Sequence, residues 1–118
     1  MEYALLIYGN EADAAKMTPA EGQAMFQGYM EFTKWIEASG KHKGGRPLEK
    51  VANSTTVRVR NGKTSSTDGP FAETKEQLGG FYLVEAKDLD EAIAIAAKIP
   101  GAKQGCIEVR PIMQIPGM

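Results

Sequence analysis

Short apolar runs separated by turn residues predict that much of this chain forms β-strands. Residues 3–8, YALLIY, are continuously apolar and end at Gly9-Asn10, a pattern typical of a buried strand. A second apolar strand is expected over residues 81–85, and a third over residues 107–110, where apolar and charged positions alternate. Residues 41–54 contain several turn residues and predict a loop with one short strand.

Polar and apolar positions alternate most regularly over residues 55–60, TTVRVR. Threonine and valine fall on one face of this segment, and threonine and arginine on the other. Asn61-Gly62 follows directly, and this dipeptide favours the two-residue turn of a β-hairpin. The return strand is therefore expected over residues 63–67, and it leads the chain to Asp68.

A helix is predicted from about Pro19 to Ser39. Thr18 suits the N-cap, Pro19 suits the first helical position, and Glu21 completes a capping box. Gly40 suits the position just after the end of the helix. Apolar residues recur here at helical spacing and so share one face: Met25, Tyr29, Phe32 and Ile36.

A second helix is predicted after Asp88. Glu91 follows three residues later and repeats the capping pattern, and Pro100-Gly101 ends the helix. Its expected buried face consists of Leu89, Ala92, Ile93 and Ala96. Both predicted helices therefore have an apolar face to lay against a sheet.

The expected order of elements favours an α+β fold. Strands at both ends with two helices between them are typical of a ferredoxin-like plan, an antiparallel sheet with both helices on one face. At 118 residues the chain is expected to be one domain, residues 1–118. The open sheet face needs a cover, so we expect a homodimer. The alternative is a monomer with a polar open face, which would suit Arg58, Arg60, Glu108 and Arg110.

Charge and composition narrow the classes of function. There are 14 basic and 15 acidic residues and no basic stripe, which argues against direct binding to nucleic acid. No apolar run approaches the roughly 18 residues of a membrane-spanning helix, and the first residues do not resemble a secretory signal. The single cysteine, Cys106, suits a reducing compartment, so we expect a cytoplasmic protein. Its strand context predicts a buried, unreactive thiol.

Candidate chemistry gathers in residues 67–81, TDGPFAETKEQLGGF. Asp68 precedes Gly69-Pro70, where its carboxylate can bond to nearby backbone N–H groups in an Asx-turn. Phe71 is apolar in a polar neighbourhood, so we expect it to insert into the core and fix the loop. A carboxylate held there and partly desolvated could act as acid or base, which makes Asp68 the candidate catalytic residue. The simpler interpretation is a turn-capping aspartate beside a solvated face formed by Glu73, Lys75 and Glu76.

Four further residues are candidates for substrate binding: Lys75, Glu76, Phe71 and Arg46. Arg46 could hold an anionic group through bidentate hydrogen bonds, or simply pair with an acidic neighbour. His42 is the single histidine, and a lone loop histidine is most often solvated. One histidine and one cysteine make no metal-ligand pattern, so neither a metal nor another cofactor is expected. Gly79-Gly80 suggests close backbone packing or a bulge rather than a phosphate loop.

The stretch TDGPFAETKEQLGGFYLVE, followed by DLDEAIAIAAKIP and GCIEVRPI, resembles the YCII-related family, in particular its DGPF-type branch. The opening MEYALLIYG and the hairpin TTVRVRNGK are similar to the same family, so the resemblance covers nearly the whole chain. It implies a ferredoxin-like chain of the dimeric α/β-barrel group. In the wider group a histidine paired with an aspartate is the suspected catalytic pair. Asp68 matches that aspartate, whereas His42 falls in no matching motif.

Two functional hypotheses follow. The first is a small-molecule enzyme, lyase- or isomerase-like, with Asp68 as acid or base in a cleft between the sheet and the helices. The second is a non-catalytic accessory or regulatory module that binds a ligand or a protein. For this second hypothesis the resemblance implies an alternative sigma factor as partner, because members of the DGPF-type branch are often associated with such factors.

Overall fold

Four strands form a single antiparallel sheet in the computed structural model, which describes residues 1–118. The strand order is β2-β5-β1-β6, and every neighbouring pair is antiparallel. The first and last strands along the chain are therefore adjacent, as in a ferredoxin-like sheet. The strands are β1 (Glu2–Gly9), β2 (His42–Pro47), β5 (Gln77–Glu85) and β6 (Cys106–Pro111).

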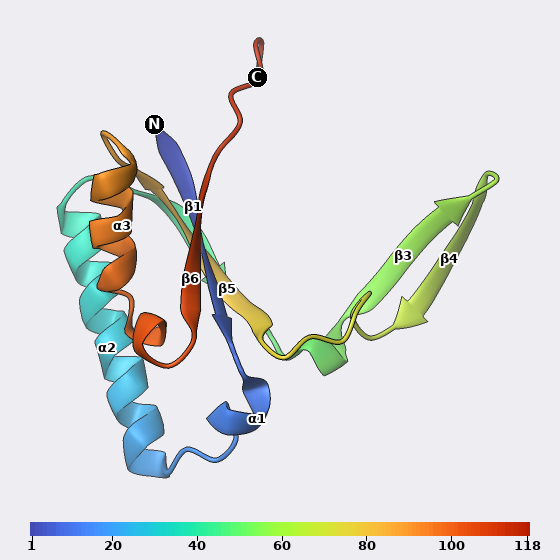
Figure 1. Ribbon diagram of the computed structural model, residues 1–118, viewed down its shortest axis with the longest axis horizontal. Helices are drawn as coiled ribbons and strands as arrows, with labels where there is room; N and C mark the ends of the chain where they lie inside the picture. The colour runs from blue at the N-terminus through green and yellow to red at the C-terminus, as the bar shows by residue number, and fades with distance from the viewer.

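Two helices cover one face of this sheet. Figure 1 shows α2 (Pro19–Ala38) and α3 (Leu89–Ala97) lying side by side against it. A short helix α1 (Glu11–Ala14) follows β1, and two 3₁₀ turns, η1 (Val51–Asn53) and η2 (Pro100–Lys103), link other elements. The α+β prediction is confirmed, and the arrangement is consistent with a ferredoxin-like fold. None of the helices is both long and apolar enough to cross a membrane.

Both long helices begin where capping chemistry predicts. The Thr18 hydroxyl accepts a hydrogen bond from the Glu21 backbone N–H, and the Glu21 carboxylate accepts one from the Thr18 N–H. This reciprocal pair satisfies two N–H groups that the helix itself leaves without partners. At α3 the Asp88 carboxylate accepts from the Glu91 N–H in the same way.

The core lies between the sheet and the two helices. Strand residues Tyr3, Leu5 and Val84 meet Phe32 and Ile36 of α2. Helix α3 adds Ala92, Ile95 and Ala96, and Ile99 closes the end of the cluster. The predicted buried face of α3 is partly wrong, because Leu89 is 49% exposed and Ile93 is 50% exposed. Helix α3 sits rotated so that Ile95 faces the sheet instead.

Strand β5 begins four residues earlier than predicted and takes in Gly79-Gly80. The pairing register with β1 shifts here, because Ile7 is opposite Gly80 and Tyr8 is opposite Leu78. Gly79 is the extra residue of this β-bulge. A Cβ atom on Gly80 would lie 3.0 Å from the carbonyl oxygen of Arg46. The pair therefore provides both the bulge and the close backbone packing that the sequence suggested.

The predicted hairpin stands apart from the rest of the molecule. Strands β3 (Thr55–Arg60) and β4 (Lys63–Asp68) form a two-stranded sheet of their own, called the arm below, which projects away from the body (Figure 1). Asn61 and Gly62 have φ values of 52° and 75°, as a hairpin turn with both central residues left-handed requires. The arm raises the radius of gyration to 16.4 Å, against about 13.5 Å for a compact chain of this length.

The other face of the four-stranded sheet carries no helix. Side chains alternate along a strand, so Ala4 and Leu6 point away from the buried Tyr3 and Leu5. Ala4 pairs with Leu83, and Leu6 pairs with Phe81, on the neighbouring strand β5. These four apolar side chains are only half-buried in one chain. They form what is called the bare face below.

Candidate functional site

A cleft of about 1020 Å³ lies between α2 and the helix-covered side of the sheet. Strand β1 and helix α1 form one part of its wall, and β2, β5 and η2 form others. Helix α2 contributes residues along most of its length, from Glu21 to Glu37. Its volume is close to the upper end of the range for small-molecule sites, about 300–1,000 Å³.

Glycines are frequent in the lining of this cleft. Six of them line it: Gly9, Gly45, Gly79, Gly80, Gly101 and Gly105. At Gly45 a Cβ atom would lie 2.5 Å from the carbonyl oxygen of Phe81, and at Gly105 it would overlap the carbonyl oxygen of Tyr8. A side chain at these two positions would push the strands apart, so they need glycine to keep the strands together.

Four polar or amphipathic side chains meet in the cleft: Tyr29, Thr33, His42 and Tyr82, called the polar cluster below. The hydroxyl oxygens of Thr33 and Tyr82 lie 2.8 Å apart and share a hydrogen bond. The imidazole of His42 meets the Tyr82 ring edge-on, with ring centroids 6.1 Å apart. Phe32 packs against the same ring at 4.9 Å, also edge-on, and so ties it to the core.

Tyr29 contributes a phenol whose pKa is shifted. Burial raises the pKa of its phenol above the ordinary value of 10.0, and a backbone hydrogen bond with Gly101 lowers it in part. The phenol is therefore neutral at physiological pH and can both donate and accept a hydrogen bond. Gly101 also leaves space for the hydroxyl, because a Cβ atom there would lie 2.6 Å from Tyr29 Oη.

The rest of the lining includes both methionine-rich and acidic residues. Met17, Met25, Phe26 and Met30 line the cleft, and methionine side chains adapt readily to ligands of different shape. Four carboxylates line it as well, from Glu11, Asp13, Glu21 and Glu37. Among the lining residues Arg46 is the only lysine or arginine. The lining therefore disfavours anionic ligands.

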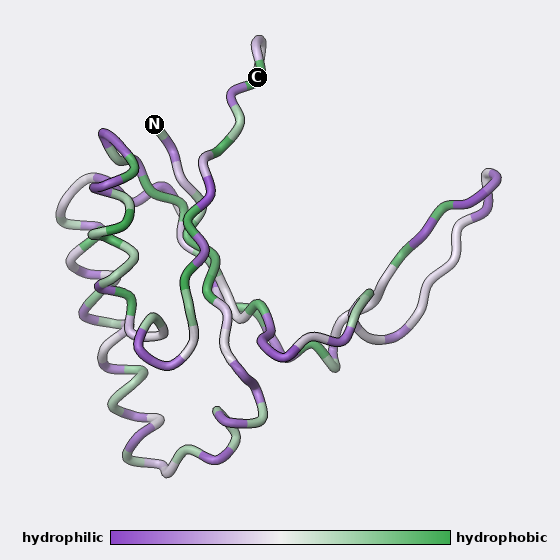
Figure 2. The backbone as a smooth tube through the Cα atoms, viewed as in Figure 1, coloured by the Kyte–Doolittle hydropathy of each residue, from purple (hydrophilic) through white to green (hydrophobic).

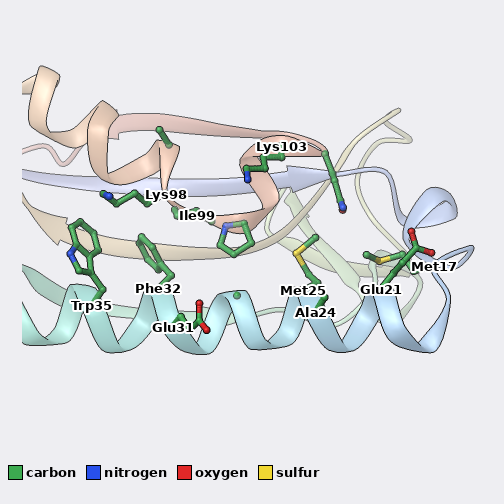
Figure 3. A pocket seen from close by; sticks show the side chains of 14 residues that line it. Met17, Glu21, Ala24, Met25, Glu31, Phe32, Trp35, Lys98, Ile99 and Lys103 are labelled. Atoms are coloured by element: carbon green, nitrogen blue, oxygen red, sulfur yellow. The ribbon is translucent and has the colours of Figure 1, made fainter.

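A second cavity, called the groove below, lies on the other side of α2. It measures about 640 Å³ and separates α2 from the end of α3 and η2. Figure 3 shows Phe32 and Trp35 next to one another on α2, facing Ile99 and Lys98. The Lys98 ammonium lies 5.0 Å from the centre of the Trp35 ring, a cation–π contact that closes one end. Met17, Glu21 and Met25 line both cavities, so the first half of α2 has open space on two sides.

The structure separates the residues that the sequence proposed for one site. Asp68 is the last residue of β4, at the root of the arm, and its side chain is exposed. Lys75 and Glu76 are exposed in the segment that returns from the arm to β5. Arg46 is the only predicted site residue that lines the cleft. Its guanidinium donates a hydrogen bond to the carbonyl of the preceding residue, Gly45.

The prediction that Phe71 inserts into the core is wrong. Its side chain is 80% exposed, because no other part of the chain covers the segment from Gly69 to Glu76. The Asx-turn expected of Asp68 has no counterpart among the side-chain hydrogen bonds. Thr56 instead closes the turn, with its hydroxyl donating to the Gly69 carbonyl at 2.8 Å.

The prediction of a buried Cys106 is also wrong, because the residue is exposed at the start of the edge strand β6. Partial desolvation and the nearby carboxylate of Glu76 raise the pKa of its thiol. The Glu76 carboxylate lies 3.9 Å from Cys106 Sγ. A raised pKa keeps the thiol protonated, and a protonated thiol is a poor nucleophile. No group of three or more potential ligands surrounds a metal-sized space anywhere in the chain.

Sequence reasoning missed most of the polar cluster. Tyr82 and Thr33 are 49 positions apart and meet only because α2 packs on β5. One signal was present: Tyr82 alternates with Val84, and it therefore shares the helix-covered face of the sheet. The glycines near the start of β5 and after α3 were a second signal, because glycine in a strand often marks a bulge or a close approach of another group.

Sequence comparison relates this architecture to known proteins. The family model for the YCII-related domain matches residues 1–116. An uncharacterized protein of Rhizobium meliloti (strain 1021) is 35% identical over 114 residues, which cover 95% of this chain and 92% of that relative. The chain therefore belongs to the YCII-related domain family.

Proposed function

We propose that this protein is a homodimer that binds a small molecule in the cleft and acts on it by lyase- or isomerase-like acid–base chemistry. The observation that carries the proposal is the polar cluster, which sets convergent hydroxyl and imidazole groups in a cleft lined by methionine and phenylalanine. A large pocket with a few convergent polar groups is the usual form of a ligand site. The motif from Asp68 to Phe71 supports assignment to the DGPF-type branch.

The lining suggests the chemical class of the ligand. An apolar body would contact the methionine-rich wall, and a carbonyl or hydroxyl group would accept or donate a hydrogen bond at Tyr82 and Tyr29. Four carboxylates against one guanidinium favour a neutral or cationic molecule over an anionic one. The ligand is thus an uncharged or positively charged molecule with one polar end.

Proton transfer in the cleft has two candidate groups within one chain. The imidazole of His42 has two ring nitrogens that can donate or accept a proton, and it lines the cleft. The neutral phenol of Tyr29 can donate a hydrogen bond to a developing negative charge. Asp68, the candidate from the sequence, lies outside the cleft of its own chain, and we propose that it acts only in the dimer.

The bare face supports the homodimer. Ala4, Leu6, Phe81 and Leu83 form an apolar surface in the middle of the sheet, with no helix over it. A second copy that presents the same face would cover both surfaces at once, the self-complementary contact of a twofold dimer. At the edge of this face Arg110 pairs with Glu108 of its own strand, so these charges are compatible with a covered sheet.

Ligand screening by thermal shift tests the proposal. A panel of neutral, cationic and anionic metabolites is added to wild type and to the variants Tyr82→Phe and His42→Gln. A ligand at 100 times its Kd stabilises the folded state by about 2.7 kcal/mol, which raises Tm by roughly 10 °C for a chain of this size. We expect a neutral or cationic compound to stabilise wild type, and both cleft variants to lose most of the shift.

Tyr3→Phe is the matched control, because it also removes a tyrosine hydroxyl, but one that contacts Met1 outside the cleft. It should keep the full shift. A ligand that stabilises Tyr82→Phe and His42→Gln as much as wild type would disprove the cleft as its site. Asp68→Asn should keep ligand binding and lose turnover. A protein that binds no compound and co-purifies with an alternative sigma factor would favour the accessory module instead.

A further inference from the structure

The two faces of the arm differ in chemistry. Cross-strand pairing sets Val57 opposite Ser66, Val59 opposite Thr64, and Thr55 opposite Asp68. Directly paired residues point to the same side of a hairpin, so Val57, Val59 and Asp68 share one face. The valines are 60% and 57% exposed. Figure 2 shows the alternation of hydrophobic and hydrophilic positions along β3.

The other face of the arm is cationic. Arg58 pairs with Ser65, and Arg60 pairs with Lys63, so three basic side chains lie opposite the valines. Within residues 55–68 these three face a single acidic residue, Asp68. The remaining residues hold the other 11 basic and 14 acidic side chains, so the arm is positive and the body is negative.

Few interactions hold the arm to the rest of its own chain. It forms a sheet separate from that of the body, and at its root Gly69 donates a backbone hydrogen bond to Ser54. An isolated two-stranded hairpin is at best marginally stable in water. A surface with two exposed valines and a nearby phenylalanine, Phe71, that is 80% exposed is typical of a contact with another chain.

We propose that the face of the arm that carries Val57 and Val59 is covered by a second copy of this chain. The inference rests on the proposed homodimer and adds a second contact to it, distinct from the bare face. Net charge favours this occupant: the arm has three basic and one acidic residue, and the rest of the chain has 11 basic and 14 acidic residues, so two copies attract each other at long range while the valines form the contact itself. The arm is joined to its own body at one end only and projects away from it, as Figure 1 shows.

This contact gives Asp68 a place in the dimer. Asp68 lies on the covered face, so burial of the valines carries its carboxylate into the interface with the second copy. Phe71 follows three residues later and would enter the same interface. Asp68 and Phe71 are thus presented to the partner and not to the cleft of their own chain.

The test compares the two faces of one arm. Val57→Asn with Val59→Asn removes the apolar pair, and Arg58→Asn with Arg60→Asn alters the opposite face of the same strand. Sedimentation velocity over a dilution series gives the dimer dissociation constant of each protein. We expect the valine variant to weaken the dimer at least about 100-fold, since two buried side chains are lost, and the arginine variant to weaken it less than about tenfold.

A photo-crosslinking amino acid locates the contact directly. p-Benzoylphenylalanine in place of Val59 should give a covalent dimer on irradiation, and in place of Arg60 it should give little. A dimeric wild type whose dissociation constant the valine variant leaves unchanged would overturn the covered arm and leave the homodimer standing. A monomeric wild type would overturn both. The ligand-induced changes in Tm report on the cleft separately, so a result against the arm contact does not count against ligand binding in the cleft.

Discussion

The hydroxyl oxygen of Thr33 lies 2.8 Å from the phenolic oxygen of Tyr82, which joins helix α2 to strand β5 in the wall of the cleft. It is the only hydrogen bond in the polar cluster that joins side chains of two different elements. Its length is typical of a hydroxyl–hydroxyl bond. It holds the Tyr82 ring where the ring also meets Phe32 and His42, so one bond orients the aromatic floor of the cleft.

Removal of either hydroxyl should show that the two residues act as a pair. Tyr82→Phe leaves the part-buried Thr33 hydroxyl without its partner, and we expect a loss of about 1 kcal/mol in the free energy of unfolding. Thr33→Val should cost a similar amount, and the double variant should cost less than the sum. Urea unfolding of the four proteins measures this coupling. Strictly additive losses would show that the hydroxyls contribute independently.

The contact between Gly101 and Tyr29 gives a second prediction. An alanine at Gly101 would set its Cβ atom 2.6 Å from Tyr29 Oη and 3.2 Å from the side chain of Ile7. We expect Gly101→Ala to destabilise the fold by about 1–3 kcal/mol, because the phenol must move. In the Tyr29→Phe background the same change should cost much less, since the next ring atom is 3.9 Å away.

Gly9→Ala is the control for this comparison. Gly9 also lines the cleft, but nothing lies within 4 Å of a Cβ atom there. Thermal unfolding of wild type, Gly9→Ala, Gly101→Ala, Tyr29→Phe and the Tyr29→Phe/Gly101→Ala double variant makes this comparison. If Gly101→Ala lowers stability as much in the Tyr29→Phe background as in wild type, the strain lies against Ile7 and not against the phenol.

Local chemistry allowed the sequence to predict the elements well. The capping residues Thr18 and Asp88 set the helix starts, and Asn61-Gly62 set the hairpin, because each acts on backbone groups within a few positions. Helix α3 was harder to orient. It is apolar almost all round, so periodicity could not choose between Ile93 and Ile95 as the residue that faces the sheet.

The site was predicted less well, because it depends on packing between distant segments. Asp68 and Arg46 both drew attention through their residue types, yet only Arg46 reaches the cleft. Phe71 looked like a core residue because it is apolar, but hydrophobicity does not say which layer, if any, covers a side chain. Six glycines line the cleft, and they add no side-chain chemistry that a motif could reveal.

The buried phenol of Tyr29 should make the fold sensitive to alkaline pH. Burial raises its pKa in the folded state above the ordinary value of 10.0, so the folded protein keeps a proton that the unfolded chain releases. The unfolded state then binds fewer protons, and the free energy of unfolding falls as pH rises. This contribution is fully present below pH 10 and is lost as the pH rises through the folded-state pKa. Urea unfolding between pH 9 and 11 should show a steeper fall for wild type than for Tyr29→Phe, and parallel curves would show that the phenol is not protected.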